Sequence, residues 1–296
     1  MEYITVNDYL KNIYGEKVYK LAIDGGFTCP NRDGTIGMGG CIFCSAEGSG
    51  DFAEDRCLSV TEQIERGKIR VEKKMTGSKY IAYFQAFTNT YAPIEVLRKK
   101  YEEAISCPEV VILSIATRPD CLSDEVIELL SEINRKKTVW VELGLQTIHE
   151  DTAKYIRRGY PLSVYDAAVK RLKAIGIHVI THVILGLPGE GRTEMLETVH
   201  YVGESGSDGI KLQLLHVLRG TDLASEYEAG KFETLSLEEY VQLVCDSIRL
   251  LPKEMVIHRM TGDGDRRKLI APLWSLDKKK VLNTLTKALR EAERKI

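Results

Sequence analysis

Three cysteines near the start of the chain lie within one stretch, CPNRDGTIGMGGCIFC, that is poor in apolar side chains. Eleven residues separate Cys29 from Cys41, and two more separate Cys41 from Cys44. Thiolates spaced C-x2-C reach one metal centre, and the glycines of the stretch let the chain fold back to bring Cys29 alongside. Three thiolates suit a cubane 4Fe-4S cluster and leave one iron open to an external ligand, whereas a structural zinc site normally takes four ligands.

A zinc site is the competing interpretation of this stretch. Cys57, thirteen residues after Cys44, is the nearby thiol that would complete a set of four. A second C-x2-C pair, typical of structural zinc sites, is missing, so we favour the three-ligand interpretation. The other cysteines are expected to be small buried hydrophobic residues: Cys107, Cys121 and Cys245.

Composition limits the class of protein that carries these cysteines. The 296 residues are 44% hydrophobic, enough to bury a full core as one large α/β domain or two smaller ones. The stretch MEYITVNDYL shows neither the basic nor the apolar part of a signal peptide, and no apolar run approaches the ~20 residues that cross a bilayer. We therefore expect a soluble cytoplasmic protein with no membrane partner. In that reducing compartment seven cysteines, an odd number, are not expected to form disulfides.

Short apolar runs alternate with helical segments along most of the chain, which predicts parallel strands joined by helices. From the second run onward, the runs begin roughly 30 to 40 residues apart, the length of one βα unit. Their first residues are Val18, Tyr80, Val110, Val139, His178 and Gly209. With right-handed crossovers this alternation predicts an open sheet or a barrel, and six units suit an incomplete barrel. The predicted fold class is α/β, a partial (β/α)6 barrel.

The chain is expected to form a barrel over residues 1–235 and a C-terminal extension over residues 236–296. A loop over residues 24–57 carries the three cysteines and follows the first strand, so its thiols stand at the carboxyl end of the sheet, where α/β barrels place their active sites. From about Ser236 the pattern changes to a helix, a short strand MVIHRM, a polar segment TGDGDRRK and a terminal amphipathic helix. We expect this α/β extension to pack on the barrel.

Phe43 directly precedes the last of the three cysteines, in CIFC. An aromatic residue at this place, with a three-cysteine loop after the first strand of a six-unit barrel, resembles the radical S-adenosylmethionine superfamily. The spacing departs from the usual three and two residues of that superfamily and resembles the branch around the bacterial YhcC and YtqA proteins, with more distant similarity to the catalytic subunit of elongator. The resemblance extends over nearly the whole chain, through KLAIDGGFTCPNRDG, AYFQAFTNTYAP, IATRPDCL, ELGLQT, VILGLPGE, LLHVLRGTDL and TGDGDRRKLIAPLW.

The resemblance implies a radical enzyme whose cofactors are a 4Fe-4S cluster and S-adenosylmethionine. Cys29, Cys41 and Cys44 would ligate the cluster, and its open iron would bind the amine and carboxylate of the methionyl group. An electron from the reduced cluster, delivered by a donor such as flavodoxin or ferredoxin, would cleave the sulfonium to a 5'-deoxyadenosyl radical. The protein has to orient the cofactor and exclude water.

Residues at the ends of the second and third strands are expected to hold the methionyl group. In FQAFTNT the chain departs from the Gly-Gly-Glu turn usual in the superfamily, and Gln85, Thr88 and Asn89 offer carbonyl and hydroxyl acceptors in its place. A polar loop that only caps the barrel is the alternative. Arg118, which precedes a proline and is therefore extended, would pair with the methionyl carboxylate; the alternative is an ion pair with Asp120.

Residues at the ends of the fourth and fifth strands are expected to hold the rest of the cofactor. Glu142 and Gln146 share one face of a strand, and a ribose diol with the methionyl group would satisfy both polar side chains. A purely structural polar pair inside the barrel is the alternative. Ile184 and Gly186, in VILGLPGE, match the adenine-contacting segment of the superfamily, although GLPG is also typical of a turn before a helix.

Two histidines are candidates for catalysis. His182 on the fifth strand and His216 on the sixth can reach the barrel interior. A lone histidine on an apolar strand is more often a core residue than a catalyst, so both assignments compete with a structural one.

The resemblance implies that the substrate is the wobble uridine of tRNA, whose carboxymethylaminomethyl side chain would be trimmed to aminomethyl. Loss of hydrogen from the carbon between amine and carboxylate, oxidation of that radical to an imine and attack by water would release glyoxylate. The net charge of −2 gives no global reason to expect nucleic-acid binding and does not exclude it. The expected RNA contacts are C-terminal basic runs, RRK from Arg266 and KKK from Lys278, with Arg259 and Trp274 as partners for an extruded base.

Two other functions are compatible with the residues. A radical enzyme for a small metabolite would turn over without RNA. A zinc-stabilised RNA-binding protein without enzymatic activity would be colourless and would contain zinc.

Overall fold

The computed structural model describes residues 3–293 except 49, 51–52, 74–75 and 263. Parts of two predicted features lie outside this set: residues 49 and 51–52 of the loop over 24–57, and Asp263 of the polar segment TGDGDRRK. Residues 1–2, at the start of the predicted barrel, and residues 294–296, at the end of the predicted extension, also lie outside the described set.

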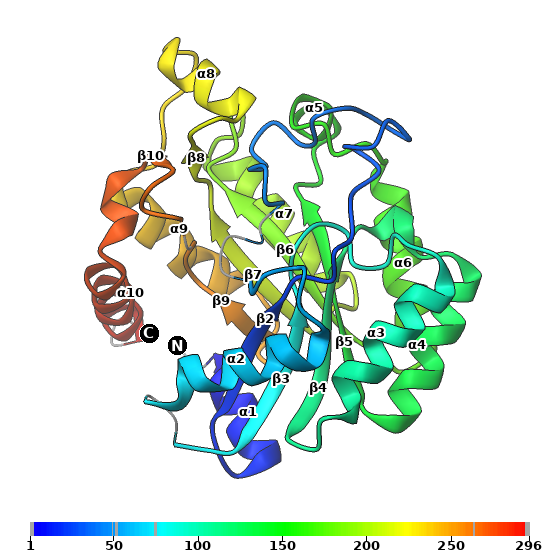
Figure 1. Cartoon of the computed structure of the whole chain (residues 1–296). Helices are drawn as coiled ribbons and strands as arrows, with labels where there is room; N and C mark the ends of the chain where they lie inside the picture. Colours follow the sequence, from blue (N-terminus) through cyan, green and yellow to red (C-terminus); the bar gives the residue numbers. More distant parts are fainter. Residues whose placement is uncertain (1–2, 49, 51–52, 74–75, 263, 294–296) are drawn as a thin grey trace.

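The described residues contain an eight-stranded sheet in which every neighbouring pair of strands is parallel. Its strand order is β1-β9-β7-β6-β5-β4-β3-β2, so the six predicted strands follow one another in chain order. Figure 1 shows the sheet curled into an open half-barrel with helices outside it. The predicted partial (β/α)6 barrel is confirmed. The strands are β1 (Ile4–Thr5), β2 (Val18–Ile23), β3 (Lys79–Phe84), β4 (Val110–Thr117), β5 (Thr138–Gln146), β6 (His178–Leu185), β7 (Gly209–Leu214) and β9 (Val256–Arg259).

The helices that connect successive strands pack on the convex face of the sheet (Figure 1). They are α2 (Val60–Glu72), α3 (Ile94–Ser106), α4 (Asp124–Lys136), α6 (Leu162–Ala174), α7 (Arg192–Glu204) and α9 (Leu237–Leu250). Their ends follow local rules. Ser59 and Glu62 form a capping box at the start of α2, and the Ser123 hydroxyl accepts the Val126 N–H at the start of α4.

Period-two alternation along the strands separates an apolar outer face from a polar inner face. On β5, Val139, Val141 and Leu143 pack among the helices, whereas Glu142 and Gln146 line a cavity inside the half-barrel. Each fully buried aliphatic side chain of the outer face contributes roughly 1.5 to 3 kcal/mol. This layer holds the strands in register and so fixes the places of the inward polar side chains.

The amino end of the half-barrel is closed by an apolar plug. Helix α1 (Val6–Tyr14) lies across this end and buries Leu10 with Trp140 and Ile180 of the inner face. The cavity therefore has no outlet past these residues and faces the carboxyl ends of the strands.

The C-terminal residues continue the same sheet. Strand β9 pairs with β7 on one side and β1 on the other, and α10 (Lys278–Glu293) packs against α9. A small antiparallel pair joins β8 (Val217–Leu218) to β10 (Leu269–Ala271). The predicted boundary between residues 235 and 236 stays a prediction. The remaining short elements are α5 (Glu150–Tyr155), α8 (Asp222–Glu228), η1 (Pro119–Cys121) and η2 (Leu273–Leu276).

Among the helices of the described residues, none is both long and apolar enough to span a membrane.

Candidate active site

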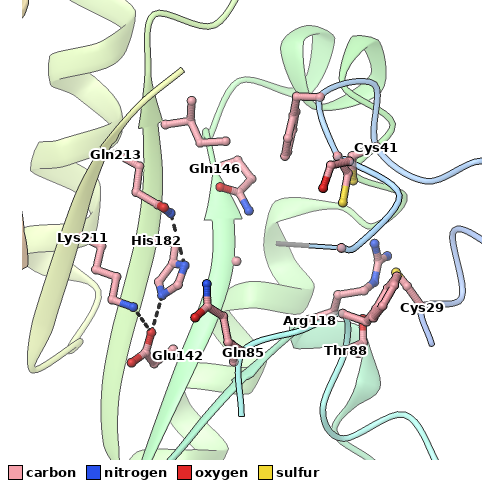
Figure 2. A pocket seen from close by; sticks show the side chains of 18 of the residues that line it. Cys29, Cys41, Gln85, Thr88, Arg118, Glu142, Gln146, His182, Lys211 and Gln213 are labelled. Atoms are coloured by element: carbon pink, nitrogen blue, oxygen red, sulfur yellow. Dashed lines mark hydrogen bonds and ion pairs between the residues drawn. The ribbon is translucent and has the colours of Figure 1, made fainter. Parts of the chain in front are cut away.

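A cavity of about 470 Å³ lies inside the half-barrel. It extends from the cysteine loop, defined here as residues 24–57, to polar side chains on the middle strands (Figure 2). Side chains from β2 to β7 and from β9 line it. It therefore occupies the end of an α/β barrel at which substrates bind.

The cysteine loop folds back on itself around Arg32. The Asn31 carbonyl accepts the Gly40 N–H at 2.8 Å, and the Arg32 Nη2 donates to the Ser45 carbonyl at 2.5 Å. Gly40 has φ +87°, and a Cβ there would lie 2.9 Å from Arg32 Nε. The predicted role of glycine in this fold-back thus has a specific cause, because a side chain at position 40 would displace the arginine.

The fold-back brings the three cysteines to one end of the cavity. Cys29, Cys41 and Cys44 all line it, whereas Cys57 is exposed and is not among the described residues that do. In the described part of the chain, no three His, Cys, Asp or Glu side chains form a compact ligand set. The loop supplies three sulfur donors to one cavity, and no fourth cysteine is among the described residues that line it.

Burial disfavours the charged thiolate form of Cys41. Burial, together with the neighbouring Cys44, raises the pKa of the Cys41 thiol to about 12. Asn31 Nδ2 lies 3.6 Å from the Cys41 sulfur. A metal centre would reverse the effect of burial, because it stabilises the thiolate directly.

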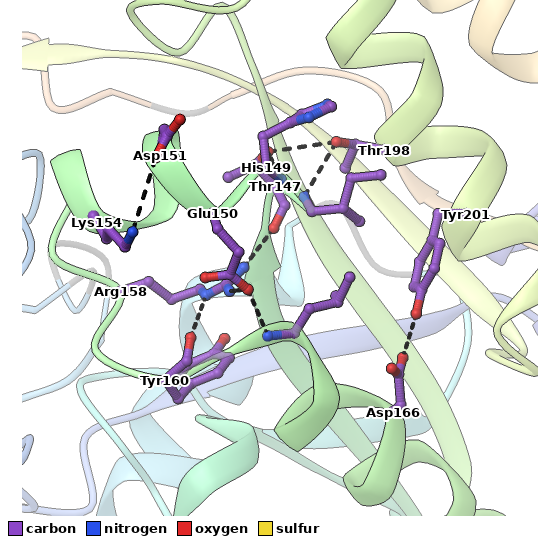
Figure 3. A network of polar contacts seen from close by, with 12 residues as sticks. Thr147, His149, Glu150, Asp151, Lys154, Arg158, Tyr160, Asp166, Thr198 and Tyr201 are labelled. Carbon is purple, nitrogen blue, oxygen red and sulfur yellow. Dashed lines mark hydrogen bonds and ion pairs between the residues drawn. The ribbon is translucent and has the colours of Figure 1, made fainter.

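A polar network behind the loop holds it in place (Figure 3). Arg158 is 2% exposed and donates to the carbonyls of Thr147 at 2.6 Å and Tyr160 at 2.9 Å and to the Glu150 carboxylate at 3.1 Å. One residue earlier, the Arg157 carbonyl accepts the Asn31 amide at 2.6 Å. The network thus fixes a turn on which the cysteine loop rests.

Gly159 is the closest point of that turn to the loop. Its φ is +83°, and a Cβ would lie 2.9 Å from Asn31 Oδ1 and 3.1 Å from Ile36 Cγ2. This support was not predicted. Its only signal in the sequence is a glycine after two arginines, in RRGY, and that pattern does not reveal what the turn contacts.

The residues expected to hold the methionyl group divide into two sets. Gln85, Thr88 and Arg118 line the cavity. Asn89 is fully buried outside its lining, where its amide donates to the Ala116 carbonyl at 2.8 Å. For Asn89 the structure therefore favours the loop-capping alternative.

Arg118 makes the ion pair that was the alternative to its ligand role. Its guanidinium donates to both carboxylate oxygens of Asp120, at 2.9 and 2.7 Å. The same group lies 5.2 Å from the centre of the Tyr160 ring and faces the cavity. The ion pair leaves room for the predicted ligand role, because a guanidinium has five donors and Asp120 uses two of them.

Glu142 is fully buried but has several partners within the protein. Its carboxylate accepts from Lys20 Nζ at 2.9 Å, from Ser114 Oγ at 2.8 Å, from His182 Nε2 at 2.7 Å and from Lys211 Nζ. Glu142 therefore has its hydrogen-bond partners within the protein and does not need a bound ligand to supply them. Gln146 differs: its Oε1 is buried at the cavity wall without a hydrogen-bond partner among the described residues.

Ile184, Gly186 and His216 lie at or just after the carboxyl ends of β6 and β7. Ile184 and His216 line it. Gly186 has φ +94° and its N–H donates to Met195 Sδ at 3.0 Å, so it shapes the strand end without lining the cavity.

His182 is held as a neutral imidazole. Burial and the nearby Lys211 lower its pKa to about 4. Its Nε2–H donates to the ionised Glu142, which leaves Nδ1 as acceptor for the Gln213 amide at 3.3 Å (Figure 2). Both ring nitrogens are hydrogen-bonded within the protein. This arrangement favours a role in orienting Glu142 and Gln213 over a role in proton transfer.

Sequence reasoning missed the cations of the cavity. Lys20 on β2, Lys211 on β7 and Arg259 on β9 all line it, and Arg259 had been assigned only to base stacking. The sequence contains a signal for the two lysines, since each stands in the middle of an apolar strand run, VYKLAI or GIKLQL. A lysine in such a run is costly to bury unless its charge has a partner.

The other expected RNA contacts lie outside the cavity lining. Arg266, Trp274 and Lys278 to Lys280 line a shallow groove. The Trp274 indole donates to the Leu235 carbonyl at 2.9 Å and packs against Tyr240, so its ring is partly committed to the core. Lys268, beside this segment, forms an ion pair with Glu47 of the cysteine loop.

Comparisons with known proteins agree with this site. The model of the radical SAM superfamily matches residues 29–202, and the model of the Radical_SAM C-terminal domain matches residues 207–291. Uncharacterized protein YtqA of Bacillus subtilis is 51% identical over 287 residues, which cover 97% of this chain and 89% of YtqA. Protein YhcC of Escherichia coli is 43% identical over 88% of this chain and 84% of its own length.

More distant similarity extends to Elongator complex protein 3. The protein from Mus musculus is 28% identical over 55% of this chain and 30% of its own length. The solved structure of Methanocaldococcus infernus Elp3 has a TM-score of 0.71 at 18% identity and covers 94% of this chain and 63% of that one. This likeness shows a shared fold. The chain belongs to the radical SAM superfamily, whose cofactors are a 4Fe-4S cluster and S-adenosylmethionine.

Proposed function

We propose that this radical SAM enzyme trims the carboxymethylaminomethyl side chain of the wobble uridine of tRNA to aminomethyl. One observation carries the proposal: three cysteines and the inward polar ends of the strands share a single cavity. A cofactor at the cysteine end and a side chain reaching the opposite end would therefore meet within that cavity. Sequence similarity to Elongator complex protein 3 favours a tRNA substrate over other candidates.

The cysteine end has the donor chemistry that a 4Fe-4S cluster requires. Cys29, Cys41 and Cys44 would ligate the cluster, and Cys57, exposed and held by its N–H to Asp55 at 2.9 Å, would not. The same geometry counts against a zinc site, which needs a fourth ligand. When bound, the cluster and S-adenosylmethionine supply a 5'-deoxyadenosyl radical that removes a hydrogen atom from the substrate.

The residues around this end would orient S-adenosylmethionine. Arg118 would pair with the methionyl carboxylate, and Thr88 and Gln85 would accept from its amine. Gln146, whose buried Oε1 lacks a partner among the described residues, would accept from a ribose hydroxyl, and Ile184 would contact the adenine. Glu142, Gly186 and Asn89 would act behind this layer, by holding the side chains and strand ends that line the cavity.

The proposed reaction balances as a two-electron oxidation followed by hydrolysis. The carbon between amine and carboxylate loses a hydrogen atom, and the substrate then loses one electron to an oxidised electron carrier and becomes an iminium ion. Water adds to that ion, and the carbon–nitrogen bond breaks to give the aminomethyl uridine and glyoxylate. His182, a neutral imidazole, and His216 line this space, and neither is required as a proton donor in these steps.

Recognition of the tRNA body is assigned to the groove formed by Arg266, Trp274 and Lys278 to Lys280. Four cations in this groove face one carboxylate, that of Asp277, which favours phosphate binding. A reductant such as flavodoxin or ferredoxin and a cytoplasmic location remain predictions that belong to the same proposal.

Nucleoside mass spectrometry of tRNA tests the proposed function. Cells that lack the gene should accumulate carboxymethylaminomethyl uridine and lose its aminomethyl product, and the purified, reconstituted enzyme should convert such tRNA while forming 5'-deoxyadenosine. An unchanged tRNA profile, with intact S-adenosylmethionine cleavage, would instead favour a small metabolite as substrate.

A further inference from the structure

Gln213, near the carboxyl end of β7, lines the cavity away from the cysteines. Its side chain is half-buried there. In Figure 2 it lies beside His182 at one end of the cavity, whereas Cys29 and Cys41 lie at the other end. Gln213 is therefore placed to contact a substrate in the cavity, and not the metal centre.

The protonation of His182 determines how the Gln213 amide is oriented. Glu142 accepts hydrogen bonds from the Lys20 and Lys211 ammonium groups, so its carboxylate is ionised and has no proton to donate. Burial raises the pKa of Glu142, but the two lysines outweigh burial and leave the pKa well below its ordinary value. The contact of 2.7 Å between Glu142 and His182 Nε2 therefore places a proton on that nitrogen.

The other ring nitrogen of His182, Nδ1, carries a lone pair because the imidazole is neutral. Gln213 Nε2 lies 3.3 Å from Nδ1, and the amide N–H is the group that donates there. The carbonyl oxygen Oε1 is the branch of the amide that does not contact His182. Among the described residues, the contact with His182 is the one hydrogen bond of this side chain. An acceptor of defined orientation therefore lines the cavity.

The hydrogen bond to His182 makes this acceptor selective. An amide that turns freely offers a ligand either its oxygen or its N–H group. A reversed Gln213 would set its oxygen against the lone pair of His182 Nδ1, and it would lose its hydrogen bond. The site therefore favours a ligand that donates a hydrogen bond and disfavours an analogue that lacks the donor.

We propose that Gln213 is a substrate-binding residue whose Oε1 accepts a hydrogen bond from an N–H group of the substrate, and that Glu142 and His182 are its positioning residues. The inference rests on the proposed function and deepens it. The proposed uridine offers two such donors, N3–H of the uracil ring and the amine of the side chain. An analogue that lacks one or the other distinguishes between them.

Three variants separate this role from a structural one. Gln213→Met keeps an unbranched side chain of similar length and removes the amide. Gln242→Met is the matched control, because Gln242 is exposed on α9 and is not among the described residues that line the cavity. His182→Phe keeps a ring but removes both nitrogens, so it frees the amide to turn, while Glu142 keeps its other three donors.

The first experiment measures binding and does not depend on turnover. Saturation-transfer NMR titrations of the holoenzyme, with S-adenosylmethionine and without reductant, use three nucleosides: 5-carboxymethylaminomethyluridine, its N3-methyl derivative, and the ether in which oxygen replaces the side-chain amine. In wild type and Gln242→Met, the analogue that lacks the contacted N–H should bind roughly tenfold more weakly than the parent. In Gln213→Met, at an unchanged melting temperature, this penalty should disappear because the parent itself binds weakly.

The penalty is compared between proteins because a steric clash or a lost charge in the analogue would affect wild type and Gln213→Met alike. Equal penalties in these two proteins, or a parent nucleoside that does not bind wild type, would overturn the inference. Equilibrium dialysis gives the affinity for S-adenosylmethionine, which should be the same in both. A loss of that affinity equal to the loss for the nucleoside would assign Gln213 to the cofactor instead.

The second experiment tests the positioning residues and separates this inference from the proposed reaction. His182→Phe should reduce the penalty, because the freed amide no longer favours a donor; the full wild-type penalty in this variant would contradict the positioning role. With tRNA as substrate, Gln213→Met should raise KM more than it lowers kcat. Nucleoside binding that depends on Gln213, without conversion of tRNA, would contradict the proposed reaction and still support the binding role.

Discussion

Arg118 and Asp120 form a two-point ion pair at the end of β4, in which Nε donates to one carboxylate oxygen at 2.9 Å and Nη2 to the other at 2.7 Å. Asp120 thereby fixes the plane of the guanidinium where it faces the cavity beside the cysteines. A ligand carboxylate would bind the remaining donors of an arginine that is already oriented.

Arg118→Ala should therefore weaken binding of S-adenosylmethionine to the reconstituted protein by about 1.5 to 3 kcal/mol, the range for a hydrogen bond to a charged group. Asp120→Asn keeps the shape of the partner and leaves Arg118 its charge, so its effect on affinity should be much smaller. Equilibrium dialysis of both variants measures the difference. Equal losses in the two variants would indicate that the pair only supports the fold.

Gly159→Ala should impair assembly of the cysteine end. The alanine is strained at φ +83° and would also press on Asn31 and Ile36 of the cysteine loop. Gly206 has nearly the same φ, +85°, but nothing lies within 4 Å of a Cβ there. Gly206→Ala therefore introduces the backbone strain, about 1 kcal/mol, without a steric clash. Iron and sulfide content after anaerobic reconstitution should fall in Gly159→Ala and stay at the wild-type level in Gly206→Ala. Equal content in both variants would contradict the supporting role of the turn.

His182 should make the protein less stable as the pH falls from neutrality. Burial and Lys211 lower its folded pKa to about 4, from an ordinary value of 6.5. Below pH 6.5 the unfolded chain takes up a proton that the folded chain does not, so the free energy of unfolding decreases until the pH reaches the folded pKa. Between pH 7 and pH 5 this residue accounts for a loss of roughly 2 kcal/mol.

Denaturant unfolding of His182→Gln at the two pH values checks this loss, and the variant should lose less stability on acidification than wild type. His200 is exposed on α7, outside the cavity, and His200→Gln is the matched control that should keep the wild-type difference. If His182→Gln loses as much unfolding free energy between pH 7 and pH 5 as wild type does, the histidine is not held neutral by its surroundings.

Charge reversal in the C-terminal groove should weaken tRNA binding and reduce its salt dependence. Arg266 and Lys279 line this groove and are exposed, so Arg266→Glu combined with Lys279→Glu removes two phosphate contacts and flattens the slope of log K against log salt by roughly 1.5 to 2. Lys99→Glu with Arg135→Glu, on the outer helices α3 and α4, is the control with the same change in charge. An equal effect of both double variants would mean that the groove is not the RNA site.

Much of the barrel was predictable because its signals are local. Apolar runs such as VVILSIAT predict the strands, and the S-x-x-E spacing of Ser59 and Glu62 is typical of a helix start. Strand β1, Ile4–Thr5, was not predicted, because two residues are too few to show an alternating pattern. It exists because β9 offers it a partner, and such pairing is a property of the folded sheet.

The partners of the site residues were not predictable for the same reason. Period-two alternation turned Glu142 inward, but Lys20 and Lys211 meet it only through the register of β2, β5 and β7. The Arg158 turn supports the cysteine loop across more than 120 residues of chain, as the separation of Asn31 and Arg157 shows. Motifs identify the residues that carry the chemistry, whereas the side chains that position them come from distant strands and turns.

The most direct test of the central claim compares Cys57 with the three cysteines that line the cavity. Cys29, Cys41 and Cys44 are each changed to alanine, with Cys57→Ala as the matched control. After anaerobic reconstitution, iron, sulfide and zinc are measured beside formation of 5'-deoxyadenosine. Each of the first three variants should lose the brown 4Fe-4S absorption and the product, since two thiolates do not hold a cubane firmly, and Cys57→Ala should retain both. A wild-type protein loaded with zinc, or a Cys57 variant as inactive as the Cys41 variant, would contradict the account.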